Sequence, residues 1–349
     1  MKTTQTNFDW NFIGNEALVE LLEKKIVHDR LSHAYLFWGP AHVGKNTLVQ
    51  RFVQSILCFY GAGSTTQNVP CRTCDHCRQI QVGAHPDVFL IERAFDEKNQ
   101  KKRKNITISQ IRKLQSRMNT GSFLNNYKIG IIREADTLTI EAANSLLKTL
   151  EEPHEKVILI LIAKNITLLP KTLISRTQTY KLRSVRAELI AERIMVEHHD
   201  RSRARVFSQL SNGLPGIALE LCRNEALFRQ HQESIQLFYN CTQNDLVFRL
   251  KKAEQLFSKE QDHQDAVSKL IGFFDAWICV LRDMMMIKNA QAERNFIQNS
   301  WYYDNIVQLA QQYPNKKIIF LLEYLERAKK KLHGNINHKL LLDNFLLYL

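Results

Sequence analysis

Several features common in proteins of this length are missing from the sequence. The 349 residues contain no run of about 18 apolar residues, and the polar amino end lacks the apolar segment of a signal peptide. These absences argue against a transmembrane helix and a secretory signal, and they predict a cytoplasmic protein. We find neither an internal repeat nor a low-complexity linker. With 44% hydrophobic and 24% charged residues, the composition is typical of a globular protein.

Acidic residues are too few to balance the basic ones. Lysine and arginine number 48 against 35 aspartates and glutamates, which gives a formal net charge of +13. This excess favours a partner that carries phosphate groups, although it could serve only to keep the protein in solution. Part of it is a basic run over residues 98–104, either a contact for DNA or a solvated loop. The aromatic residues lack the regular spacing of a protein that stacks single-stranded bases.

Short apolar segments alternate with helical patterns in the first half of the chain. Continuous apolar strands separated by helices are typical of a parallel sheet that is covered on both faces. We therefore predict an α/β domain over residues 1–182. Its expected strands are residues 34–38, 87–91, 128–132 and 157–162.

Beyond residue 182 the apolar pattern is helical throughout. The sequence Gly-Leu-Pro-Gly at residues 213–216 interrupts short helices, and longer amphipathic patterns follow, such as residues 266–286 and 318–332. We predict a small helical domain over residues 183–225 and an all-α domain over residues 226–349.

A glycine loop of the phosphate-binding type follows the first expected strand. Gly39, Gly44 and Lys45 fit the pattern G-x-x-x-x-G-K. In such loops backbone amides hold the phosphates, the lysine reaches the β- and γ-oxygens, and a following Ser or Thr hydroxyl binds Mg²⁺. Asn46 stands at the hydroxyl position, and Thr47 is expected to point elsewhere because one residue turns a helix by about 100°. The loop is either a degenerate ATP site or merely a tight turn.

The second magnesium-holding element is altered as well. An acidic residue is expected at the end of the third strand, and Arg133 stands there instead. A cation at this place repels Mg²⁺, although it could neutralise phosphate directly. Glu134 follows and could polarise a water molecule. With both metal-holding elements changed, we predict no useful ATP hydrolysis by this chain alone.

Four of the seven cysteines fall within twenty residues of each other. In a reducing compartment such a cluster favours a metal site over disulfides. Four thiolates match a closed, tetrahedral, structural zinc site, with an iron–sulfur cluster or free thiols as alternatives and His76 and His85 as further donors. The first cysteine ends the helix after the glycine loop, so the metal would attach a small insertion to the domain. The proposed ligands are Cys58, Cys71, Cys74 and Cys77.

Taken in order, the motifs of this chain resemble those of a known family. The match is dense over residues 31–182 and returns at residues 213–219 and 335–340. The chain resembles the bacterial clamp-loader family of AAA+ proteins, which covers the gamma/tau and delta-prime subunits of DNA polymerase III. The carrying segments are residues 33–37 before the glycine loop, the cysteine group, residues 85–87, 111–112, 142–153 (AANSLLKTLEEP) and 175–177 (SRT).

Within that family, the active gamma/tau subunits differ from this chain at several places. Besides Asn46 and Arg133, Ala163 and Lys164 stand after the fourth strand where a small polar sensor is expected, and Gly216 or Ile217 stands where a lid arginine is expected. These departures match the delta-prime branch, a rigid member of a pentameric ring. The alternative is a divergent, active gamma/tau-like ATPase, and a weaker one is a zinc-bearing DNA-binding module.

The resemblance also implies a mechanism and partners. Family members use ATP to open a ring-shaped sliding clamp and place it on primer–template DNA, in a heteropentamer of gamma/tau, delta and delta-prime subunits. Residues 183–225 would form the lid and residues 226–349 the collar. Arg176 would reach the neighbouring subunit's γ-phosphate, and such arginines contribute about 10³–10⁵ in rate in GTPases. The alternative for Arg176 is an internal salt bridge.

Overall fold

The structure of this chain is a computed structural model that describes residues 7–61, 68–96, 101–120, 127–257, 263–294, 296–332 and 337–349. It divides into two units, which we describe separately. Unit 1 comprises residues 1–189 with 213–216, and unit 2 comprises residues 190–212 with 217–349. Among the described residues, no helix is both long enough and apolar enough to cross a membrane.

Unit 1 is built on a five-stranded parallel sheet, which confirms the predicted fold class. The strand order is β2-β5-β6-β1-β7. Four of these strands lie where the apolar segments predicted them. The fifth, β7, was missed because its sequence QTYK is polar, as suits a mostly exposed edge strand. The strands are β1 (Ala34–Trp38), β2 (Val88–Ile91), β5 (Lys128–Ile132), β6 (Val157–Ala163) and β7 (Gln178–Lys181).

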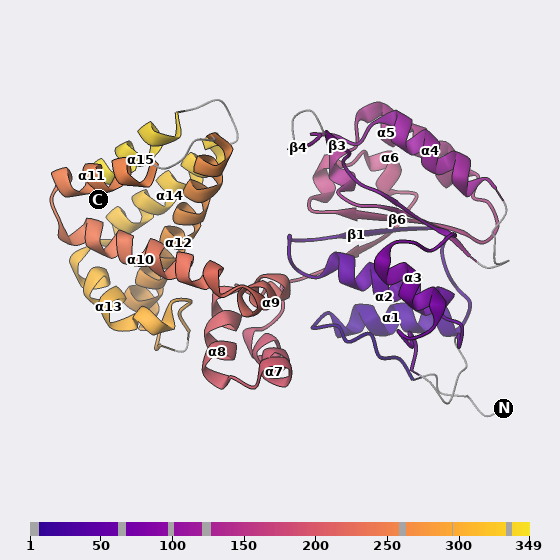
Figure 1. The fold of residues 1–349 in the computed structure, drawn as a ribbon, viewed down its shortest axis with the longest axis horizontal. Helices are drawn as coiled ribbons and strands as arrows, with labels where there is room; N and C mark the ends of the chain where they lie inside the picture. Colours follow the sequence, from indigo (N-terminus) through magenta and orange to yellow (C-terminus); the bar gives the residue numbers. More distant parts are fainter. Residues whose placement is uncertain are drawn as a thin grey trace. The chain divides into compact units, whose positions relative to one another are not determined.

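Different helices cover the two faces of the sheet. Along β1, Tyr35 and Phe37 point to one face and Ala34 and Leu36 to the other, because side chains alternate along a strand. The first face packs against α1, α2 and α3, and the second against α4, α5 and α6 (Figure 1). The helices are α1 (Glu16–Val27), α2 (Lys45–Leu57), α3 (Asp75–Val82), α4 (Ile108–Met118), α5 (Ile140–Glu151) and α6 (Lys171–Ile174), with short 3-10 turns η1 (Ala135–Thr137) and η2 (Ile166–Leu168).

Burial of α2 fixes the position of the glycine loop. The side chains of Leu48, Phe52 and Val53 are fully buried against the sheet. Each such side chain contributes about 1.5–3 kcal/mol to folding. The helix begins directly after Gly44, whose φ of 98° lies in the left-handed region. The amino end of α2 is thereby held beside the carboxyl end of β1.

Local capping explains where α4 and α5 begin. Thr107 and Gln110 form a capping box at the start of α4. The hydroxyl of Thr139 accepts a hydrogen bond from the Ala142 amide at the start of α5. Helix α5 then ends at Glu151, two residues before a proline, as its sequence predicts.

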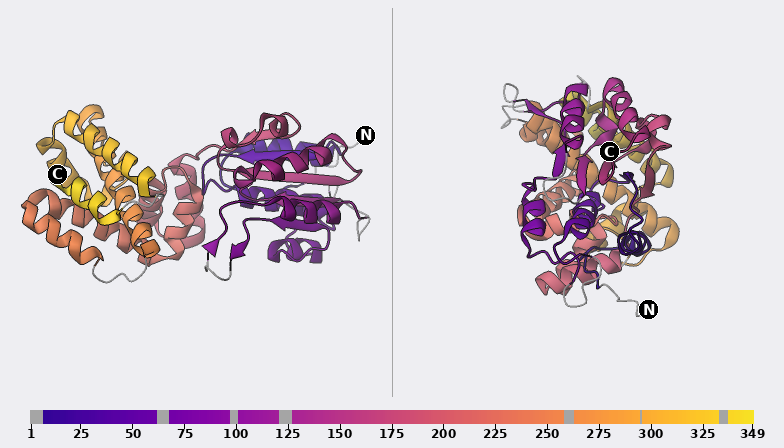
Figure 2. Two further views of the ribbon diagram at one scale, coloured as in Figure 1. Left: turned by 90° about the horizontal axis from the view of Figure 1, so that it is seen from above. Right: turned by 90° about the vertical axis from the view of Figure 1, so that its right-hand side faces the viewer.

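A small antiparallel hairpin carries part of the basic run. Its strands are β3 (Phe95–Asp96) and β4 (Lys101–Lys102), and it stands away from the main sheet (Figure 2). Residues 97–100, and Lys98 with them, lie outside the described residues.

The regular elements that the structure describes in unit 2 are all helices, as the sequence predicts. Its core surrounds Trp277, which is fully buried and whose Nε1 donates to the Ser234 carbonyl at 2.9 Å. The expected helices at 266–286 and 318–332 lie within α12 and α14. The helices of this part of the chain are α7 (Ala187–His198), α8 (Arg201–Leu210), α9 (Pro215–Arg223), α10 (Glu225–Gln243), α11 (Leu246–Phe257), α12 (His263–Ala290), η3 (Ser300–Tyr302), α13 (Tyr303–Gln312), α14 (Asn315–Leu332) and α15 (His338–Leu347).

Candidate functional site

A cavity of about 550 Å³ opens at the carboxyl edge of the sheet in unit 1. The glycine loop follows β1, Glu92 follows β2, Arg133 and Glu134 follow β5, and Lys164 follows β6. Because these strands are parallel, the residues after them meet at one edge, where ligands of open α/β sheets bind. Gly44, Lys45 and Asn46 all line the cavity, as the sequence led us to expect, but Gly39 does not line it.

The loop lysine is held by its own loop. The Lys45 ammonium donates to the carbonyls of Gly39 at 2.7 Å and Pro40 at 2.5 Å. Only 9% of the residue is exposed. The pKa of Lys45 is lowered to about 8, mainly by burial, with Asp136 acting to raise it and the charge of Lys164 acting to lower it. A phosphate entering the cavity would therefore compete with two carbonyl oxygens for this amine.

Both loop glycines are required by close contacts inside the fold. A Cβ on Gly39 would lie 2.4 Å from the Leu182 carbonyl oxygen, and one on Gly44 would lie 2.9 Å from the Phe12 ring. Both residues also have positive φ angles, 148° and 98°. The glycine pattern is thus explained by packing whether or not phosphate binds.

Two polar residues follow the loop lysine at the cavity wall. Asn46 and Thr47 are both exposed and both line the cavity. The cavity thus extends beside the first turn of α2.

Glu134, the remaining candidate for activating water, is bound to an arginine. Arg93 donates from Nε to Oε2 and from a terminal nitrogen to Oε1, both at 2.8 Å. The pair lowers the pKa of Glu134, so the carboxylate is ionised but both oxygens are already used. The sequence analysis missed Arg93. Its only signal was its place two residues beyond β2, at the same sheet edge.

Cations outnumber carboxylates around the cavity. Besides Lys45, its lining includes Lys102, Arg133 and Lys164, against Glu92 and Glu134. Glu92 Oε2 lies 3.4 Å from the Lys102 ammonium and 3.9 Å from Arg133. Lys102 comes from the basic run that we had considered for DNA contact, but β4 brings it to this cavity.

The position expected for a lid arginine contacts the loop backbone. The Gly216 amide donates to the His42 carbonyl at 2.8 Å. A Cβ on Gly216 would lie 2.8 Å from that same oxygen and 3.2 Å from the His42 Cα. The backbone of α9 at Gly216 therefore packs directly against the backbone of the glycine loop.

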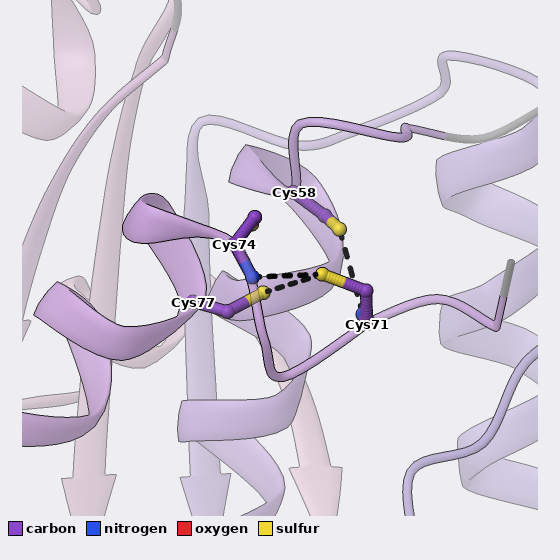
Figure 3. A group of neighbouring side chains, drawn as sticks. All are labelled: Cys58, Cys71, Cys74 and Cys77. Atoms are coloured by element: carbon purple, nitrogen blue, oxygen red, sulfur yellow. Dashed lines mark hydrogen bonds between the residues drawn. The ribbon is translucent and has the colours of Figure 1, made fainter.

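The four clustered cysteines converge (Figure 3). Their sulfur atoms all lie within 4.8 Å of one another, and Cys71 Sγ is 3.9 Å from Cys77 Sγ. In a zinc tetrahedron with Zn–S bonds of about 2.3 Å, sulfurs are about 3.8 Å apart. Cys58 ends α2, Cys74 caps α3, and Cys77 lies within α3. These four residues are positioned to hold a metal ion.

The nearby histidines pair with each other instead. His76 Nδ1 lies 3.0 Å from His85 Nε2, and the Asp87 amide donates to His85 Nδ1 at 3.1 Å. Burial is the main cause that lowers the pKa of His85. Among the described residues, the group able to hold a metal consists of the four cysteines without a histidine.

Arg176 lies at the opposite edge of the sheet from the cavity. It precedes β7, whose Gln178 pairs with Tyr35 near the start of the parallel strand β1. Leu182, which contacts the glycine loop, follows the other end of β7. Arg176 is not among the residues that line the cavity of its own chain.

Within its own chain, Arg176 makes two contacts. One terminal nitrogen lies 2.7 Å from Glu151 Oε1 and the other donates to the Thr172 carbonyl at 3.0 Å. The arginine side chain is 37% exposed and that of Glu151 51% exposed. The internal salt bridge considered from the sequence is present, but exposed pairs of this kind contribute little to stability.

Comparison with known proteins identifies related chains. Residues 14–186 match the family described as "DNA polymerase III, delta subunit". The chain is 30% identical to DNA polymerase III subunit delta' of Bacillus subtilis over 336 residues, which cover 95% of each protein. It is 24% identical to the tau subunit of that organism over 345 residues, covering 92% of this chain and 57% of tau. A solved gamma subunit-related protein from Thermotoga maritima aligns over 95% of this chain and 97% of its own, with 18% identity and a TM-score of 0.42.

The identity to the delta' protein extends over nearly the whole of both chains, whereas tau continues well beyond the matched part. The family match covers the glycine loop, the four cysteines and Arg176. This chain belongs to the family of DNA polymerase III delta-prime subunits, clamp-loader proteins with an AAA+ P-loop domain.

Proposed function

We propose that this chain is a non-hydrolysing subunit of the clamp loader that lends Arg176 to the ATP site of a neighbouring subunit. Its relatives include tau and gamma subunits of DNA polymerase III, which supports membership of the same complex. The proposed partners are gamma/tau and delta subunits in a heteropentamer, the sliding clamp, and primer–template DNA. A cytoplasmic location is part of this proposal.

The observation that carries the proposal is the charge at the carboxyl end of β5. Arg133 lines the cavity where a magnesium-holding carboxylate is needed, and Glu134 has both oxygens bound to Arg93. Hydrolysis of ATP requires a metal ion to neutralise charge and a positioned nucleophile. The positive charge of Arg133 opposes binding of the metal ion, and the ion pair with Arg93 occupies Glu134, the carboxylate that could position the nucleophile.

The position of Arg176 supports a role in trans. Arg176 precedes β7 at the amino edge of the sheet, is not among the residues that line its own chain's cavity, and has a partly exposed side chain. A ring of such subunits can place this edge against the cavity of the next member. The contact with Glu151 would hold the Arg176 side chain in place until a phosphate of the neighbouring subunit takes the place of the Glu151 carboxylate.

The four cysteines have a structural role in this proposal. Four sulfur ligands fill a tetrahedral zinc ion and leave no open position for catalysis. The ion would join the end of α2 to α3 and so fix the insertion between them. Arg103 and Lys104 remain the exposed candidates for DNA contact in the basic run.

A reconstituted loader tests the arginine role. We expect Arg176→Ala to lower DNA-stimulated ATP turnover and clamp loading by at least tenfold while the assembled complex keeps its size. Glu151→Ala removes the internal pair but keeps the arginine, and Lys171→Ala changes an exposed cation of the neighbouring helix. Both should leave turnover within about twofold. Equal losses for Arg176→Ala and Glu151→Ala would mean that only the internal salt bridge matters.

The alternative is a divergent gamma/tau-like subunit that hydrolyses ATP itself. The intact lysine and the cavity favour it. It requires Glu134 to leave Arg93 and a metal ion to bind beside Arg133. Turnover by the purified chain separates the two functions.

A further inference from the structure

The cations of the cavity are arranged around the glycine loop. The Gly39 amide donates to the Ala163 carbonyl at 3.3 Å, which sets Lys164, the next residue, beside the loop. Arg133 follows the adjacent central strand, where Ile132 pairs with Leu161 of β6. Arg133 and Lys164 therefore lie at the ends of two neighbouring strands, and both line the cavity.

The carboxylates of the cavity are already neutralised. Glu134 is bound by Arg93, and Glu92 lies near Lys102 and Arg133. Among the described lining residues this leaves an excess of positive charge and no carboxylate without an ion-pair partner. A divalent cation would meet repulsion here, and an anion would be attracted.

We propose that this cavity binds a polyphosphate chain without a divalent metal, with Arg133 and Lys164 in place of magnesium. This inference rests on the proposed loss of metal-dependent hydrolysis at the same site. The two side chains together carry the two positive charges of Mg²⁺. Both line the same cavity as the loop residues Ala41, His42 and Gly44, and a guanidinium fits phosphate oxygens with paired donors.

The size and the lysine of the cavity fit this ligand. A volume of about 550 Å³ lies within the usual range of small-molecule sites, about 300–1,000 Å³. Lys45 lies beside the loop carbonyls of Gly39 and Pro40 and would move its amine to a phosphate oxygen. A bound polyphosphate would also restore the full charge of Lys45, whose pKa burial has lowered to about 8.

Titration calorimetry of the purified full-length chain tests the proposal. ATP should bind in the presence of EDTA, and adding excess Mg²⁺ should strengthen the affinity by no more than about threefold. Inorganic triphosphate should also bind, and an affinity equal to that of ATP would mean that the polyphosphate alone is recognised. Arg133→Ala and Lys164→Ala should each weaken binding by about tenfold, the loss expected for one charge-assisted hydrogen bond.

Two further variants make the result specific. Arg103→Ala removes a cation next to Lys102 in the chain but outside the cavity lining, and should leave the affinity unchanged. Arg133→Asp should abolish binding in EDTA and make any remaining binding dependent on Mg²⁺. Absence of ATP binding in EDTA, or binding that needs Mg²⁺ in the unmodified chain, would overturn this inference. Absence of binding would leave the proposed non-hydrolysing role intact, whereas Mg²⁺-dependent turnover would overturn both.

Discussion

Arg93 donates hydrogen bonds to both carboxylate oxygens of Glu134, with two nitrogen–oxygen distances of 2.8 Å. The two residues follow β2 and β5, the neighbouring strands at one side of the sheet. A glutamate held in this way is ionised and oriented, and its lowered pKa makes it a weaker base toward water. The pair explains why Glu134 can line the cavity without acting as a catalytic base.

The Arg93–Glu134 pair should stabilise the protein in a pH-dependent way. Because Arg93 lowers the pKa of Glu134 below its ordinary value of 4.5, the contribution is present above that pH and is lost as the pH falls through the lower, folded-state value. We expect Arg93→Ala to reduce the free energy of unfolding by about 1 kcal/mol near pH 7 and by less near pH 3. Urea denaturation at the two pH values measures the difference.

The matched control is Arg327→Ala, which removes an exposed ion pair with Glu323 in unit 2. Its effect should stay below about 0.5 kcal/mol at both pH values. A loss for Arg93→Ala that is equal at both pH values would contradict an electrostatic origin.

Restoring an arginine at Gly216 should fail for steric reasons. Any Cβ at this position approaches the His42 carbonyl oxygen to 2.8 Å, and the Gly216 amide is already bonded to it. We expect Gly216→Ala to destabilise the chain by about 1–3 kcal/mol, and Gly216→Arg by at least as much. The midpoint of denaturation checks this.

Gly272 provides the comparison for that substitution. A Cβ there meets nothing within 4 Å, and the residue lies inside α12. Gly272→Ala should therefore raise stability by about 0.5–1 kcal/mol. If Gly216→Ala were also stabilising, the close contact between α9 and the glycine loop would be wrong.

Removal of the metal should destabilise unit 1 without changing any chemistry. We expect the purified chain to contain about one zinc ion, and Cys71→Ser or a chelator to lower the stability of unit 1 by at least about 2 kcal/mol, or roughly 4–8 °C in melting temperature. Cys222→Ser, at a cysteine outside the cluster, should retain the metal. An unchanged melting temperature after chelation would refute a structural metal.

The parts of the fold that the sequence predicted best are its buried apolar runs. The strands at residues 34–38 and 128–132 were predicted with their observed bounds, because continuous apolar segments next to a glycine loop or a helical pattern allow few other structures. The edge strand β7 was missed because only one of its sides pairs and its residues are mostly exposed.

The candidate site was only half visible in the sequence. The glycine loop and the cysteines have characteristic spacings, so their residues could be named in advance. Two other contacts join segments that are far apart in the sequence, so no local pattern predicts them. These are the Arg93–Glu134 pair, 41 residues apart, and the contact of Gly216 with His42, 174 residues apart. The place of Lys102 at the cavity could not be predicted for the same reason, because the hairpin brings it there.

The most direct test of the account is steady-state ATP turnover by the purified chain with Mg²⁺, measured beside its Lys45→Ala variant. A cavity that carries Arg133 in place of a metal ligand and a glutamate held by Arg93 should give the same background rate for both proteins. Sustained turnover that Lys45→Ala abolishes would contradict the account and make this chain an ATPase in its own right.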